Sequence, residues 1–310
     1  MIHRPAVLAL LLTLSPVALA GDEGKAGRPD PRDELLVNGA WLESELGNEG
    51  IVVLHAGRDR AGYEAGHVPG ARFVAWNDVA VERDGVPNEL PPVPDLQALV
   101  RRLGVDGDDI VVIYDDEKGV VAARVYFALD YVGLGEQATL LDGQWKRWVA
   151  EGRAVAKEAP DVRPSEYTVR PRPEILTSLA AIQDSLAPGA TKKTLLLDAR
   201  PPLQFTGEEA GDGISRPGHI PGARSVFFED NLAPGDAPGL KPIGELRAYY
   251  EERGIAEAEE IVSYCRSGGQ ASLTYFVLKY LGYDPKLYDG SFAEWSAGSG
   301  TPVETGPETK

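Results

Sequence analysis

The sequence predicts an α/β protein with two doubly wound domains, each built on a central, mostly parallel sheet flanked by helices. Short apolar runs alternate with segments of helical periodicity, which is typical of parallel strands covered on both faces. The motif GHVPGA at 66–71 returns as GHIPGA at 218–223, and LDGQW at 141–145 returns as YDGSF at 288–292. A long repeat that occurs twice indicates two copies of one domain.

The predicted elements follow from these runs. In the first half, the strands are IVVL at 51–54, DIVVIY at 109–114 and ATLL at 138–141. The segment DLQALVRRLG predicts a helix with Asp95 as its N-cap and Gly104 at its end. In the second half, the strands are TLLLD, EIVSY and KLYD, and helical spacing runs from Leu273 to Leu281.

The repeats also divide the chain. We expect domains over residues 34–150 and 174–300. Residues 151–173 are polar and rich in proline, as expected of a linker. Residues 301–310 are polar with scattered glycine and proline, so we expect them to be poorly ordered.

Composition limits the classes of partner. The chain has 310 residues, of which 43% are hydrophobic, enough for two domains of about 100–200 residues each. Its formal net charge is −17 and no basic patch stands out. Neither nucleic acid nor anionic lipid is therefore an expected partner. We expect the mature protein to be a monomer that has no contact with a membrane.

The N-terminus has the pattern of a secretory signal peptide. Arg4 precedes an apolar run from Ala6 to Leu14, and Ala18-Leu19-Ala20 matches an A-x-A cleavage site. The run is shorter than the about 20 apolar residues that a spanning helix needs. We therefore predict that residues 1–20 are cleaved after Ala20 and that the protein is exported, to the periplasm.

The only cysteine, Cys265, lies where a predicted strand ends and a short loop leads into a helix. Ligands bind beyond the carboxyl ends of such strands, and a helix N-terminus favours negative charge. We expect the loop N–H groups to form an anion nest and to lower the pKa of the thiol below about 8.5. Arg266 adds a positive charge beside it. The candidate nest consists of Ser267, Gly268, Gly269 and Gln270.

The loop belongs to the motif YCRSGGQAS at 264–272, and three further motifs accompany it: LLLDAR at 195–200, RPGHIPGAR at 216–224 and LYDGSFAEW at 287–295. The order and spacing of these motifs resemble those of the tandem-domain rhodaneses, which are thiosulfate and 3-mercaptopyruvate sulfurtransferases. The resemblance covers residues from about 34 to 300. The resemblance implies two rhodanese-like domains, with the catalytic cysteine in the second. It also implies a persulfide on Cys265, no organic cofactor, a small anionic sulfur donor, and cyanide or a thiol as the nucleophilic acceptor.

The resemblance suggests roles for the arginines. Arg266 is expected to bind the oxyanion of the donor, whereas Arg200 and Asp198 are expected to support the loop. Two departures concern the donor. Gln204 stands where vertebrate rhodaneses carry a second substrate arginine, and the loop lacks the Gly-Val-Thr of mercaptopyruvate enzymes. We favour thiosulfate as the donor and keep 3-mercaptopyruvate as the alternative.

The first copy lacks the cysteine. Aligning VYF at 125–127 with TYF at 274–276 places Asp116 opposite Cys265 and Glu117 opposite Arg266. A carboxylate cannot carry sulfur as a persulfide, so we expect this copy to be a non-catalytic wall of the site. His55 stands opposite Asp198 and is interpreted as a tolerated substitution. The histidines of the repeated turns, His67 and His219, are assigned to turn structure, and no metal-ligand spacing is present.

Three other functions remain open. A cysteine-dependent phosphatase would need an arginine six residues after the cysteine, where this chain has Ala271. A non-enzymatic sulfur carrier or binding module would use the same thiol to deliver its persulfide to a partner. An exposed reactive thiol also suits a redox sensor.

Overall fold

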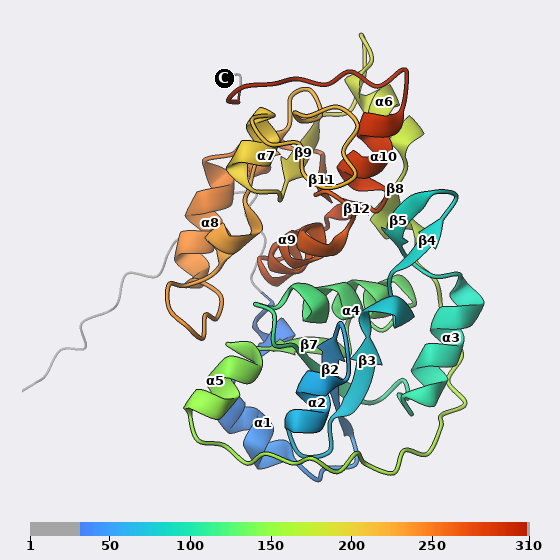
Figure 1. Ribbon diagram of the computed structural model, residues 1–310, viewed down its shortest axis with the longest axis vertical. Coiled ribbons are helices and arrows are strands. Elements are labelled where there is room, and N and C mark those ends of the chain that lie inside the picture. Colours follow the sequence, from blue (N-terminus) through green and yellow to red (C-terminus); the bar gives the residue numbers. More distant parts are fainter. Residues whose placement is uncertain (1–31, 309–310) are drawn as a thin grey trace, which may run out of the picture.

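The computed structural model describes residues 32–308, and the predicted signal peptide lies outside them. Two α/β domains lie one above the other in Figure 1, and each contains a five-stranded parallel sheet. The strand order is β1-β7-β6-β2-β3 in the first domain and β8-β12-β11-β9-β10 in the second. The two orders correspond strand by strand, which confirms the α/β class and the duplicated, parallel architecture.

The regular elements of the first domain match the predicted pattern of alternation. The helix predicted to begin after Asp95 starts earlier. The elements are β1 Leu36–Val37, α1 Gly39–Glu45, β2 Ile51–Gly57, α2 Ala61–Ala65, β3 Arg72–Ala75, β4 Val81–Arg83, β5 Val86–Glu89, α3 Val93–Arg102, β6 Ile110–Tyr114, α4 Val120–Tyr131, β7 Ala138–Leu141 and α5 Gln144–Ala150.

The second domain repeats this series without the β4–β5 hairpin. Its elements are β8 Leu176–Thr177, α6 Leu179–Leu186, β9 Thr194–Asp198, α7 Pro202–Thr206, β10 Arg224–Ser225, α8 Ile243–Glu251, β11 Glu260–Tyr264, α9 Gly269–Tyr280, β12 Lys286–Tyr288 and α10 Ser291–Ala297.

The prediction that Asp95 caps α3 is wrong. Pro92 is the N-cap, and Pro94 lies in the first turn. Proline is tolerated there because its missing N–H would have no partner inside the helix. Asp95 therefore lies in the first turn, where its negative charge still interacts favourably with the helix dipole.

Helices cover both faces of each sheet. One face of the first sheet packs against α1, α2 and α5, and one face of the second sheet packs against α6, α7 and α10. The opposite faces share one continuous core, in which α4 and α9 lie against each other between the domains. Tyr126 and Phe276 meet edge to face there, with ring centroids 4.9 Å apart. Both helices are apolar on nearly all sides because each is buried between a sheet and its counterpart.

The segment between the domains is bound to the surface of the first domain (Figure 1). Ala156 forms a β-bridge with His67, and the N–H groups of Arg170 and Arg172 donate to the carbonyls of Val132 and Tyr131. These bonds fix where the second domain begins relative to α4.

The prediction of poor order for residues 301–310 is wrong for 301–308. Glu304 forms a β-bridge with His219, and Trp295 donates its indole N–H to the carbonyl of Pro302. Polar composition does not prevent order here because backbone bonds tie the tail to the GHIPGA turn. Across residues 32–308, no helix combines the length and apolar character needed to cross a membrane.

Candidate active site

Cys265 lies at the carboxyl end of β11, immediately before the loop that leads into α9. Its side chain is buried, with 2% of the residue exposed, at the base of a cavity of about 180 Å³. The cavity opens between the two domains. It is lined by Arg58, Trp76, Asn88, Val120, Gln204, Cys265, Arg266, Ser267, Gly269 and Gln270.

Ser291 holds the loop from below. Its hydroxyl accepts hydrogen bonds from the N–H groups of Cys265 at 3.3 Å and Gly268 at 3.1 Å, and donates to the carbonyl of Tyr288. Gly268 has φ +83°, a left-handed conformation that disfavours a side chain. A Cβ at Gly269 would lie 3.0 Å from the ring of Trp76, so this glycine allows the first domain to approach closely.

The remaining N–H groups of the loop, whose residues line the cavity, have no internal acceptor among the described residues. Within residues 32–308, the N–H groups of Arg266, Ser267, Gly269 and Gln270 have no hydrogen-bond partner. Unpaired backbone donors at a helix N-terminus favour a negatively charged ligand. The loop can therefore stabilise a thiolate, a persulfide or a bound oxyanion.

The predicted alignment of the two domains is wrong by one residue at this loop. The counterpart of Cys265 in the first domain is Asp115, not Asp116. Each follows the equivalent strand directly, after Tyr114 and Tyr264. The N–H of Asp115 donates to the side chain of Gln144, as that of Cys265 donates to Ser291. The helix-based alignment was shifted because the first loop, before its N-cap Gly119, is one residue longer than the loop before Gly268.

Asp115 shows what this loop geometry binds. Its carboxylate accepts hydrogen bonds from four backbone N–H groups at 2.8–2.9 Å, those of Glu117, Gly119, Val121 and Ala122. Burial raises the pKa of Asp115 to about 6, but the four donors favour the charged form, which still predominates at pH 7. In the first domain, an internal anion thus occupies the position that the second domain leaves to the cysteine.

A buried ion pair lies beside β11, the strand that ends just before Cys265. Both oxygens of Asp198 accept from Arg200, whose guanidinium also donates to the carbonyl of Gly218 and lies 3.9 Å from the ring centroid of Phe292. Burial opposes the charge, but Asp198 outweighs it and raises the pKa of Arg200. Because Arg200 is fully buried and does not line the cavity, it supports the strand end from inside.

Of the predicted binding residues, the structure brings Arg266, Ser267, Gly269 and Gln270 to the cavity wall, while Gly268 turns the loop. Arg266 is 3.4 Å from Asp212, a fully exposed carboxylate. Ser267 accepts a hydrogen bond from the side chain of Asn88, in the first domain. No group of three histidine, cysteine, aspartate or glutamate side chains among residues 32–308 is placed to hold a metal ion.

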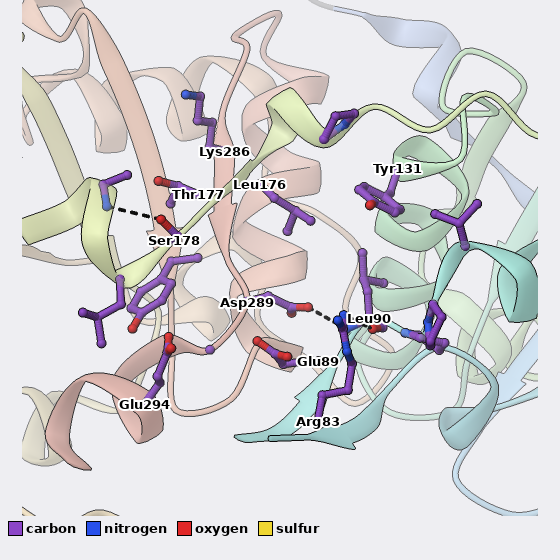
Figure 2. Close-up of a pocket in the computed structure, with 18 residues that line it drawn as sticks. Arg83, Glu89, Leu90, Tyr131, Leu176, Thr177, Ser178, Lys286, Asp289 and Glu294 are labelled. Atoms are coloured by element: carbon purple, nitrogen blue, oxygen red, sulfur yellow. Dashed lines mark hydrogen bonds between the residues drawn. The ribbon is translucent and has the colours of Figure 1, made fainter. Parts of the chain in front are cut away.

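A larger cavity of about 640 Å³ lies between the domains on the other side of the β4–β5 hairpin (Figure 2). It contains no nucleophilic thiol. Figure 2 shows Asp289 directed across the domain boundary at Leu90, whose N–H donates to it at 2.6 Å. Burial, followed by the charge of Asp289, raises the pKa of Glu89 in this cavity. Because carboxylates line this larger cavity, it suits an anionic donor less well than the smaller cavity at Cys265 does.

The profile of the rhodanese-like domain matches the chain twice, at residues 39–151 and 182–298. The chain belongs to the rhodanese-like family. It is 34% identical over 290 residues to the sulfur carrier protein TtuD of Thermus thermophilus, with 89% of this chain and 98% of that protein covered. It is 33% identical over 291 residues to a thiosulfate sulfurtransferase of Corynebacterium glutamicum, with 89% and 92% covered.

Solved structures resemble this rhodanese-like chain in fold. A complex of EanB with ergothioneine aligns with a TM-score of 0.76 at 23% identity, covering 88% of this chain and 70% of that one. The structure of YnjE aligns with the same score at 25% identity, covering 88% and 68%. The family match and the relative named as a thiosulfate sulfurtransferase support a sulfurtransferase family.

The first rhodanese-like domain contributes four cavity residues that the sequence analysis missed. They are Arg58, Trp76, Asn88 and Val120. One signal was available for Arg58, because it directly follows strand β2 and ligand sites lie beyond the carboxyl ends of such strands. The others become neighbours of Cys265 only through the packing of the two domains, which leaves no local pattern.

His55, the counterpart of Asp198, is enclosed by the rings of Tyr63, Phe73, Tyr114 and Trp145. It is 1% exposed, and its Nδ1 has no hydrogen-bond partner in the described part of the chain. Burial, followed by the charge of His67, lowers the pKa of His55 from 6.5 to about 4. The residue is therefore a neutral part of the core at pH 7.

We expect His55→Phe to weaken the acid sensitivity of the fold. The unfolded chain protonates His55 below pH 6.5 and the folded chain only near pH 4, so the native chain loses stability as the pH falls through this interval. The loss is at most about 3–4 kcal/mol, for a difference of about 2.5 pKa units at about 1.4 kcal/mol each. Unfolding free energies measured across this interval should fall less for His55→Phe. The raised pKa of Asp115 has the opposite effect on stability, but this effect is the same in the wild type and in His55→Phe. If the unfolding free energies of both chains fell equally with pH, His55 would not be the source of the acid sensitivity.

Proposed function

We propose that the protein is a thiosulfate sulfurtransferase that carries sulfur as a persulfide on Cys265. One observation supports this most strongly. In a chain of net charge −17, the described residues that line the Cys265 cavity include two arginines and no carboxylate. Such a cavity attracts a small anion to the thiol in spite of the charge of the whole protein.

The reaction has two half-steps. The Cys265 thiolate attacks the outer sulfur of thiosulfate, the S–S bond breaks, and sulfite leaves with the bonding electron pair. Cyanide or a thiolate then attacks the outer sulfur of the persulfide and releases the Cys265 thiolate. The thiolate, the persulfide and the donor are all negative, so the unpaired N–H groups of the loop assist every stage.

We expect thiosulfate to add one sulfur atom to the intact protein, and cyanide to remove it as thiocyanate. Intact-mass spectrometry followed by peptide mapping should place this sulfur on Cys265. The same measurement on protein recovered from cells reports whether residues 1–20 have been removed, as we propose for an exported chain. Uptake of no sulfur, together with turnover of p-nitrophenyl phosphate, would favour a phosphatase and sink the proposal.

A sulfur carrier is the second candidate, because a relative at 34% identity is named as one. Both functions use the persulfide, but they differ in the acceptor. Slow release of sulfur to cyanide, alongside rapid transfer to a protein thiol, would favour the carrier. 3-Mercaptopyruvate as donor is distinguished by the rate at which each compound loads Cys265.

A further inference from the structure

Arg58 reaches the Cys265 cavity from the domain that has no nucleophile. It follows β2, and its guanidinium lies 4.7 Å from the ring centroid of Trp76. Its Nε donates to Glu117 at 2.9 Å. Its Nη1 and Nη2 make no hydrogen bond within the part of the chain that the structure describes, and its side chain is 51% exposed.

The contacts of Arg58 fix the orientation of its guanidinium, but they place no negative charge inside the cavity to compensate it. Stacking on Trp76 holds the guanidinium plane, and Glu117 binds the Nε edge while lying outside the cavity lining. The remaining edge, with its two Nη groups, is the edge that matches an oxyanion bidentately. Glu117 is thus a positioning residue, although the sequence analysis had placed it in a wall of the site with no role of its own.

The second domain provides one cation for the same cavity. Arg266 is partly exposed and lies 3.4 Å from Asp212, so part of its charge is compensated. Gln204, on the cavity wall, is neutral. A dianion such as thiosulfate therefore meets one arginine from each domain.

We propose that Arg58 is a donor-binding residue, and that Trp76 and Glu117 position it to bind the oxygen atoms of the sulfur donor across the domain interface. The inference rests on the proposed function and narrows its substrate to small dianions with a sulfonate-like end. In this view, the first domain takes part in recognition although it cannot carry sulfur.

Arg58→Gln tests this, with Arg60→Gln as the matched control. Arg60 has the same charge and a similar exposure, but it pairs with Glu64 at 3.5 Å and does not line the cavity. In the otherwise intact enzyme, Arg58→Gln should raise the KM for thiosulfate by about tenfold and change kcat by less than about twofold. Arg60→Gln should leave both constants unchanged, and Arg58→Lys should be intermediate. Glu117→Gln should raise KM less than Arg58→Gln does.

Calorimetric binding of thiosulfate to the Cys265→Ser chain separates this inference from the proposed function. Binding that weakens about tenfold with Arg58→Gln, and not with Arg60→Gln, would support the role of Arg58 even if the wild-type chain formed no persulfide. Persulfide formation in the wild type, with equal thiosulfate affinity in the two arginine variants, would overturn the role of Arg58 and leave the enzyme intact. No measurable binding to the Cys265→Ser chain would also overturn it.

Discussion

Cys265→Ser is expected to lower the rate of thiocyanate formation by at least about 10³-fold, because the hydroxyl cannot form a persulfide and is a poor nucleophile without a base. Among residues 32–308, no side chain that could act as a base is hydrogen-bonded to the side chain of Cys265. Residue 265 is 2% exposed, and two neighbouring hydroxyls, of Ser267 in the loop and of Ser291 at the start of α10, are engaged with Asn88 and with the backbone. Steady-state assays with thiosulfate and cyanide measure the effect.

The fold should survive this change. Serine is nearly isosteric with cysteine, and the backbone N–H of residue 265 keeps its bond to Ser291. A thermal unfolding midpoint close to that of the wild type is the required control. Substantial residual turnover by a folded Cys265→Ser chain would place the chemistry elsewhere, because Cys265 is the chain's only cysteine.

Arg124→Met is expected to lower the free energy of unfolding by about 3–5 kcal/mol, the range for breaking a buried ion pair by removal of one partner. Arg124, in α4, is fully buried and donates from Nη1 to Asp289 of the second domain at 2.6 Å. It also donates to the carbonyls of Val79 and Asn88. Methionine fills similar volume but leaves the Asp289 carboxylate with the N–H of Leu90 and no cation.

Lys118→Met is the matched control for that experiment. Lys118 also pairs across the domains, with Glu229 at 2.7 Å, but both side chains are about 40% exposed. Exposed pairs contribute about 0–1 kcal/mol, so this variant should unfold nearly as the wild type does. Urea unfolding followed by tryptophan fluorescence gives both values. Equal losses in the two variants would contradict a special role for the buried pair.

Arg124→Met should also affect the site. The arginine donates to the carbonyl of Asn88, whose side chain donates to Ser267 in the loop after Cys265. The stability of the interface and the geometry of the Cys265 cavity therefore depend on the same buried charge.

The sequence predicted the three central strands of each sheet because strands buried on both faces must be continuously apolar, as in the segments that became β6, β9 and β11. It did not predict the outer strands β1, β3, β8 and β10, which are only two to four residues long. Helix starts were less predictable. At α3, two prolines compete with Asp95 for the role of start signal, and only the backbone conformation of Pro92 decides between them.

The candidate site was predictable where it is local. Cys265, Arg266 and the glycines belong to one loop whose spacing indicates a strand, a turn and a helix. The counterpart of Cys265 was missed because one extra residue lies between β6 and α4, and an alignment anchored on the helix cannot detect it. Trp76 and Asn88 reach the cavity only because α4 and α9 pack the two domains together. The sequence around neither residue contains a local signal for this packing.

The hydrogen-bonded carboxylate of Asp115 affects how many sulfur atoms each chain is expected to bind. We expect the chain to load a single equivalent of sulfur although its two halves share one fold, because the Asp115 carboxylate already occupies the backbone N–H groups of the N-terminal loop.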